Sequence, residues 1–173
     1  MKNSKKPVLI AVSGVKNSGK TTLIEKIIPK LNEKGLKVAT IKHDGHDFEG
    51  DVEGTDTYKH RKAGSETVII SSKNRFAMIK ELEEETNLND IIEMVLDKDI
   101  ILVEGYKKSN LRKIEVFRKG VSEKIITPKN KLIAIASDTN LDINDIIIVD
   151  KENYKKLADL IEKEKEFNFE NYQ

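Results

Sequence analysis

The sequence predicts an α/β fold, a mostly parallel sheet flanked by helices, and two observations lead to it. Apolar runs of strand length, such as residues 8–13 and 100–103, lack the polar alternation typical of half-exposed strands. Segments in which apolar residues recur with helical spacing, such as 20–33, follow those runs. Strands that alternate with helices form a parallel sheet, and a ligand is then expected at the carboxyl ends of the strands.

Each expected strand has its own signal in the sequence. The first, residues 8–13, is apolar throughout, which is typical of a strand buried on both faces. Residues 113–118 alternate charged and apolar side chains, which predicts a more exposed strand. The other strands are expected at residues 37–42, 67–71, 76–80, 99–105, 132–136 and 146–149.

The expected helices are separated by glycines and polar segments. The helix over 20–33 ends before Gly35, and shorter helices are expected over 56–63 and 88–96. A final helix follows Asp150, a suitable N-cap. The polar segment 43–55 is long for a connection in an α/β protein, which favours a functional loop. The tail over 167–173 carries aromatic residues and is expected either to dock or to fray.

Length and composition indicate one domain over residues 1–173, with a core at about 7–165 and room for a small excursion. The chain has no cysteine, which excludes disulfides, zinc–thiolate sites and cysteine nucleophiles. Its 31 basic and 30 acidic residues nearly cancel, so no nucleic-acid partner is expected. No signal peptide or membrane span is apparent, so we expect no membrane association and a cytoplasmic location.

A phosphate-binding loop is the clearest functional motif. Residues 14–21 read G-x-x-x-x-G-K-T and lie between the first strand and the first helix, where this motif binds nucleoside triphosphates. Loop amides and the helix N-terminus attract the phosphates, while Lys20 reaches the β- and γ-phosphates and Thr21 joins a Mg²⁺ shell. The expected nucleotide-binding residues are Gly14, Lys16, Asn17, Ser18, Gly19, Lys20, Thr21 and Thr22.

A carboxylate at the end of another apolar strand is the candidate metal ligand and catalytic group. Glu104 follows residues 100–103 and precedes Gly105. In proteins with this loop, a carboxylate at this place holds Mg²⁺ or orients the attacking water. The alternative is a strand-end acid that only contacts solvent.

Two histidines and two aspartates follow the second strand, over residues 43–47. Three interpretations of this segment stay open. His43, His46 and Asp47 would form a sensor of magnesium and phosphate, a polar loop with local hydrogen bonds, or a transition-metal site used by a metallochaperone.

The identity of the base is not fixed by motifs. The guanine-reading pattern N-K-x-D is matched only by Asn130-Lys131, which lacks the aspartate and precedes its strand. Asp138 follows a strand and could accept hydrogen bonds from the edge of a guanine base. An aspartate that is merely exposed at the end of its strand explains the residue equally well. GTP and ATP therefore remain alternatives on the residues alone.

Together these segments resemble the molybdopterin-guanine dinucleotide biosynthesis adaptor family, MobB. The segments that carry the resemblance are residues 14–22, Ile41-Lys42-His43 with His46-Asp47, Asp56 and Tyr58 with 61–64, 103–107, 113–116 with Arg118, and 135–138. The resemblance covers residues 8 to about 138.

The resemblance implies a fold of the P-loop NTPase type and a homodimer that binds GTP with Mg²⁺ and at most hydrolyses it slowly. Such a protein assists a molybdopterin guanylyltransferase, with molybdopterin as a further ligand. The resemblance gives Thr21, Glu104 and Asp47 to the metal, and it places His43, His46, Asp56, Arg61 and Lys107 in an adjoining groove or partner site. The alternative function is a P-loop small-molecule kinase or ligase.

Overall fold

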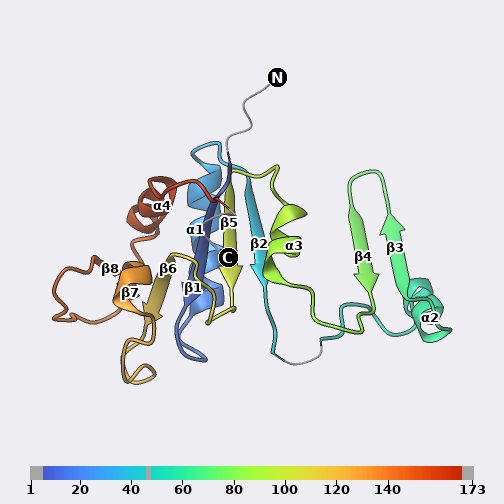
Figure 1. Ribbon diagram of the computed structural model, residues 1–173, viewed down its shortest axis with the longest axis horizontal. Helices are drawn as coiled ribbons and strands as arrows, with labels where there is room; N and C mark the ends of the chain where they lie inside the picture. Colours follow the sequence, from blue (N-terminus) through green and yellow to red (C-terminus); the bar gives the residue numbers. More distant parts are fainter. Residues whose placement is uncertain (1–5, 46–47, 169–173) are drawn as a thin grey trace. The chain divides into compact units, whose positions relative to one another are not determined.

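The computed structural model describes residues 6–45 and 48–168 of the chain (Figure 1). The chain divides into two compact units, residues 1–43 together with 91–173, and residues 44–90. In the sequence, the second unit is inserted between two strands of the first. In the part of the chain that the structure describes, no helix has the length and apolar character needed to cross a membrane.

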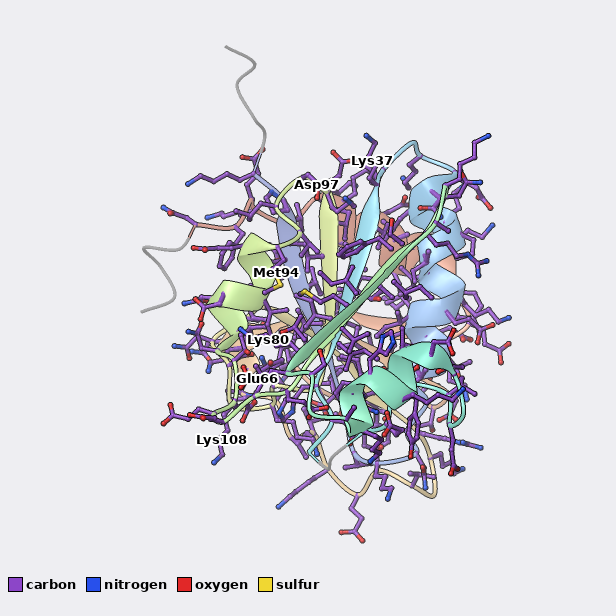
Figure 2. All side chains as sticks on the ribbon, turned by 90° about the vertical axis from the view of Figure 1, so that its right-hand side faces the viewer. Lys37, Glu66, Lys80, Met94, Asp97 and Lys108 are labelled. Atoms are coloured by element: carbon purple, nitrogen blue, oxygen red, sulfur yellow. The ribbon has the colours of Figure 1, made fainter. Side chains whose placement is uncertain are left out.

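The first unit is built on a six-stranded sheet in which all neighbouring strands are parallel, in the order β2-β5-β1-β6-β7-β8. The strands are β1 (Val8–Ser13), β2 (Val38–Lys42), β5 (Ile100–Glu104), β6 (Lys113–Phe117), β7 (Leu132–Ser137) and β8 (Ile148–Asp150). The predicted fold class is thereby confirmed. Because the strands are parallel, their carboxyl ends meet at one edge, and Lys37 and Asp97, which precede β2 and β5, lie at the other (Figure 2).

Helices α1 (Lys20–Asn32) and α4 (Tyr154–Glu162) pack on the same face of this sheet (Figure 1). The apolar stripe of α1 is buried against β1, and its Ile27 and Leu31 have no exposed surface. Burying such a side chain contributes about 1.5–3 kcal/mol. The stripe therefore fixes α1, and with it the phosphate-binding loop that precedes the helix.

The prediction that residues 113–118 form a more exposed strand is wrong. β6 lies between β1 and β7, and its Lys113 and Glu115 are each only 1% exposed. Glu115 accepts hydrogen bonds from the amides of Ile126 and Thr127, at 2.9 and 2.8 Å. The charge alternation indicated solvent, but the charged groups are instead satisfied inside the protein.

Lys113 is the second buried charge of β6. Its Nζ donates to the carbonyl and hydroxyl oxygens of Ser109, both at 3.0 Å, and to the Leu111 carbonyl at 3.2 Å. Burial lowers the pKa of Lys113 to about 8, and the charge of Lys131 acts in the same direction. This lysine therefore anchors the loop that follows β5.

The C-terminal elements differ in detail from the prediction. The N-cap of α4 is Asn153, whose side chain accepts from the amide of Lys156 at 3.1 Å, rather than Asp150. Asp150 is instead the last residue of β8, which begins two residues later than expected. Phe167 is 3% exposed, and its amide donates to the Pro7 carbonyl at 2.8 Å, so the first residue of the tail docks. The rest of the predicted tail beyond Asn168 lies outside the described residues.

The second unit contains a short helix and a β-hairpin. Helix α2 (Asp56–Lys62) begins at the N-cap Thr55, whose hydroxyl accepts from the amide of Tyr58. Strands β3 (Thr67–Ser71) and β4 (Phe76–Lys80) pair antiparallel in their own two-stranded sheet. The chain passes back to the first unit within helix α3 (Leu88–Glu93), because the second unit ends at Asp90. This helix is shorter than the predicted helix over 88–96.

Candidate phosphate-binding site

The loop between β1 and α1 has a backbone that requires glycine. Gly14 and Gly19 have φ values of +134° and +103°, and Asn17 is left-handed at +64°. A Cβ atom on Gly14 would lie 2.6 Å from the Val116 carbonyl oxygen and 2.7 Å from Ser18 Oγ. A side chain at position 14 would thus push the loop away from β6 as well as strain its backbone.

The amides of this loop are available to a ligand. Within the described residues, Ser18 is the loop residue whose amide donates to the protein, to the Val15 carbonyl at 3.3 Å. Gly19 caps α1 without a side-chain hydrogen bond, and the first turn of the helix contains no acidic residue. The hydroxyl of Ser18 is buried and unpartnered. Amides without partners at the N-terminus of a 13-residue helix are an arrangement that suits an anion.

Lys20 lies across this loop. Its Nζ donates to the Val15 carbonyl at 2.8 Å. Burial lowers the pKa of Lys20 below its usual value, Glu104 opposes that shift, and the charges of Lys107 and Lys42 reinforce it. Three lysines and one carboxylate therefore act on each other at the carboxyl edge of the sheet, and this positive field suits a polyanion.

Glu104 lies against the first turn of α1. The Thr21 hydroxyl donates to both of its carboxylate oxygens, Oε1 at 2.9 Å and Oε2 at 3.1 Å. The sheet explains this contact, because β5 is the direct neighbour of β1 and both strands end at the same edge. A hydroxyl and a carboxylate are hard oxygen ligands of the kind Mg²⁺ prefers beside phosphates, so these two residues fit a magnesium ion.

The structure brings His43 to the same edge. Its amide donates to the Glu104 carbonyl at 2.8 Å, and its ring lies 4.5 Å from the Tyr106 ring between centroids. Gly105 makes this approach possible, since a Cβ there would lie 2.8 Å from His43 Cβ. His43, Glu104 and Lys107 thus share the carboxyl edge with the phosphate-binding loop. The described residues contain no cluster of three or more metal-binding side chains.

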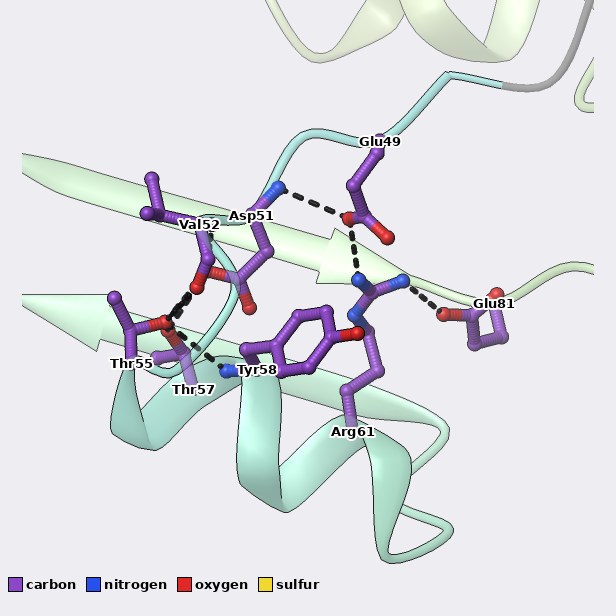
Figure 3. A network of polar contacts seen from close by, with 8 residues as sticks. All are labelled: Glu49, Asp51, Val52, Thr55, Thr57, Tyr58, Arg61 and Glu81. Carbon is purple, nitrogen blue, oxygen red and sulfur yellow. Dashed lines mark hydrogen bonds and ion pairs between the residues drawn. The ribbon is translucent and has the colours of Figure 1, made fainter.

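The other residues predicted for the groove are in the second unit or outside the described residues. Asp56 and Arg61 are part of the second unit. Arg61 forms ion pairs with Glu49 and with Glu81, the latter at 2.8 Å, and these hydrogen bonds raise its pKa (Figure 3). Arg61 therefore joins the segment before α2 to the residue after β4, which is a structural role. The predicted positions His46 and Asp47 lie outside the described residues.

Sequence reasoning missed the polar contacts behind the loop. The hydroxyl groups of Ser13 and Thr127 are 2.7 Å apart, and Glu115 holds the amide of the same threonine. Ser13 immediately precedes Gly14, so the segment after β6 is tied to the base of the phosphate-binding loop. A signal was present, since Glu115 lies between the apolar residues Ile114 and Val116 of β6, but its partners are distant in the sequence.

Comparisons with known proteins give a family match and similar curated proteins. The family model described as molybdopterin guanine dinucleotide synthesis protein B, MobB, matches residues 9–138. The molybdopterin-guanine dinucleotide biosynthesis adapter protein of Escherichia coli (strain K12) is 36% identical over 160 residues, which cover 88% of this chain and 90% of that protein. The Haemophilus influenzae protein of the same name is 33% identical and covers 89% of this chain and 87% of its own length.

Solved structures give the same relationship. A crystal structure of Bacillus subtilis MobB superposes with a TM-score of 0.71 at 27% identity, covering 91% of this chain and 99% of that one. A crystal structure of molybdopterin-guanine biosynthesis protein B superposes with a TM-score of 0.67, also at 27% identity, covering 88% and 95%. The predicted P-loop NTPase type of fold is thereby confirmed.

Proposed function

Because the chain belongs to the molybdopterin guanine dinucleotide synthesis protein B (MobB) family, we propose that it is a GTP-binding adaptor that assists a partner guanylyltransferase in forming molybdopterin guanine dinucleotide. The contact between Thr21 and Glu104, beside the free amides of the loop, carries this proposal. It supports a nucleoside triphosphate with Mg²⁺ as the ligand of this edge.

The proposed roles follow from the chemistry of each side chain. The amides of residues 14–19 and the N-terminus of α1 bind the phosphates, and Lys20 neutralises the terminal phosphate oxygens. Thr21 and Glu104 would hold Mg²⁺, which supplies charge neutralisation of the terminal phosphates when bound. Among the described residues, Glu104 is the carboxylate that contacts Thr21, so one group would serve both the metal and the attacking water. We therefore propose slow hydrolysis.

We also propose that the protein forms a homodimer through the β3–β4 hairpin. Ile69, Phe76 and Met78 are on one face of this hairpin and are 55%, 67% and 48% exposed. An isolated two-stranded sheet is marginally stable in water, and a cluster of exposed apolar side chains marks a surface that becomes covered. A second copy of the same chain offers a matching apolar face.

A reconstituted reaction tests the proposed function. Purified guanylyltransferase, GTP, Mg²⁺ and molybdopterin are incubated with and without this protein, and the dinucleotide product is quantified. We expect the protein to increase the yield and Lys20→Ala to abolish that increase. The matched control is Lys26→Ala, on the exposed side of α1. Equal yields with and without the wild-type protein would contradict the proposal.

A further inference from the structure

A cavity of about 210 Å³ lies beside the phosphate-binding loop, on the side of β1 away from Glu104. It is lined by Thr22 of α1, by Val116 and Arg118 at the end of β6, by Lys151 and Glu152 after β8, and by Tyr154, the first residue of α4. This volume is far larger than a single water needs. Figure 1 shows β5 and β6 on opposite sides of β1. Ser18 and Gly19 of the phosphate-binding loop also line it, so the cavity opens from the proposed phosphate site.

The position of Glu104 gives a direction to any nucleotide on the loop. Thr21 and Glu104 would hold the Mg²⁺ that neutralises the terminal phosphates, so their contact would mark the terminal end of a bound triphosphate. The α-phosphate and the nucleoside then leave the loop on the opposite side, past Thr22. That side is where the cavity lies.

The lining of the cavity suits a flat aromatic ring with polar edges. Val116 and Leu23 give it apolar surface, and Tyr154 is partly buried against the core. Among the described residues, no carboxylate pairs with the guanidinium of Arg118, which leaves this planar cation available to stack on a base.

A partly exposed ion pair adjoins the cavity, with Asp138 just outside the residues that line it. Lys151, which lines it, donates from Nζ to Asp138 Oδ2 at 2.9 Å. Asp138 Oδ1 accepts from the amide of Lys119 at 2.8 Å, and these two hydrogen bonds lower the pKa of Asp138. The carboxylate is thus held ionised and oriented, and each oxygen keeps a further lone pair.

Guanine and adenine present different edges to such a pair. Guanine has N–H donors at N1 and N2 for a carboxylate and an O6 acceptor for an ammonium group. Adenine has an acceptor at N1 and a donor at N6, so both of its groups meet the wrong partner. We infer that this cavity holds the nucleoside end of the nucleotide and that Asp138 and Lys151 select guanine. This inference rests on the proposed function.

Calorimetric titration with GTP, ATP and inorganic tripolyphosphate, each with Mg²⁺, tests the inference. The proteins are the wild type, Asp138→Asn, Lys151→Met and the control Asp145→Asn. Asp145 is an exposed carboxylate paired with Lys129, and its φ of +63° suits asparagine. Thermal unfolding checks that each variant is folded. If Asp138→Asn does not fold, Lys151→Met tests the inference on its own.

We expect the wild type to bind GTP more tightly than ATP by about tenfold or more, the discrimination of a good bidentate contact. Asp138→Asn and Lys151→Met should bring GTP to the affinity of ATP and leave tripolyphosphate binding unchanged, while Asp145→Asn behaves as wild type. If folded variants keep the preference for GTP, or the wild type has none, the inference is overturned while tripolyphosphate binding still supports the phosphate site. If the wild type binds neither GTP nor tripolyphosphate, the proposed function fails as well.

Discussion

The hydroxyl of Thr21 donates to both carboxylate oxygens of Glu104, although the two residues are 83 positions apart in the sequence. The contact exists because β1 and β5 are parallel neighbours that end at the same edge of the sheet. It places a carboxylate that could bind Mg²⁺ against the first turn of α1, beside the amides that would hold phosphate. The proposed function depends on this arrangement.

Glu104→Gln is expected to weaken Mg²⁺-dependent GTP binding. The amide keeps the shape of the side chain but removes its charge, and hydrogen bonds to charged groups contribute about 1.5–3 kcal/mol. We therefore expect at least a tenfold loss of affinity with Mg²⁺, little change with EDTA, and slower hydrolysis. Glu33→Gln, at the exposed C-terminal end of α1, is the control. An unchanged magnesium dependence would count against the metal role.

Glu115→Ala is expected to destabilise the fold. The substitution leaves the amides of Ile126 and Thr127 without their acceptor, in a place where the carboxylate is 1% exposed. Each buried amide left unsatisfied costs about 1–3 kcal/mol, so for the two amides we expect a total loss of about 2–6 kcal/mol in urea unfolding. Glu123→Ala, an exposed glutamate of the same segment, should change stability little. A loss as small as that of Glu123→Ala would show that the hydrogen bonds of Glu115 to these two amides do not stabilise the fold.

The buried Lys113 should make the free energy of unfolding depend on pH. Burial lowers its pKa to about 8, against about 10.4 in an unfolded chain. Between these values the unfolded chain holds a proton that the folded chain has released, so this group makes stability rise with pH. Below about pH 8 the lysine is charged in both states, and the free-energy cost of burying its charge then lowers the stability in full.

Urea unfolding of the wild type and of Lys113→Met between pH 7 and 10 measures this effect. The free energy of unfolding of the wild type, relative to the variant, should rise by about 2–3 kcal/mol across the range. Lys108→Met, an exposed lysine in the loop that Lys113 anchors, should track the wild type. A difference that stays flat with pH means that Lys113 has an ordinary pKa.

Charged substitutions in the β3–β4 hairpin should change the oligomeric state of the protein. Ile69 and Met78 are direct partners across β3 and β4, and both are about half exposed. Replacing both with lysine should turn the dimer into a monomer in sedimentation velocity, because charges would have to be buried at the interface. Ala77→Lys, on the other face of β4, is the control. A wild-type protein that sediments as a monomer would remove the dimer proposal.

Some parts of this fold and site were predictable from the sequence. The loop at residues 14–21 is local, and its glycines and lysine follow directly from the chemistry of phosphate binding. Glu104 was predictable because parallel strands end at one edge, which brings separate strand ends together. Both inferences rest on backbone rules that hold whatever the surrounding side chains are.

Other features depend on contacts between distant segments. In the sequence, a strand with buried charges has the same alternating pattern as an exposed strand. The hydrogen bonds of Lys113 to Ser109 and of Glu115 to Thr127 show that both charged groups have partners inside the protein. Asp138 was ambiguous for a similar reason, because its partners Lys119 and Lys151 follow two different strands. The cavity beside it is assembled from three separate segments, so no single motif predicts it.

Calorimetric titration of the wild type and Lys20→Ala with GTP and Mg²⁺ tests the central claim most directly. Lys20 faces the loop and donates to the Val15 carbonyl at 2.8 Å, so removing it should leave the fold intact. The account predicts saturable binding by the wild type and a loss of at least about tenfold in Lys20→Ala, since a charge-assisted contact is worth about 1.5–3 kcal/mol. Equal affinity in the two proteins, or no binding by the wild type, would contradict it.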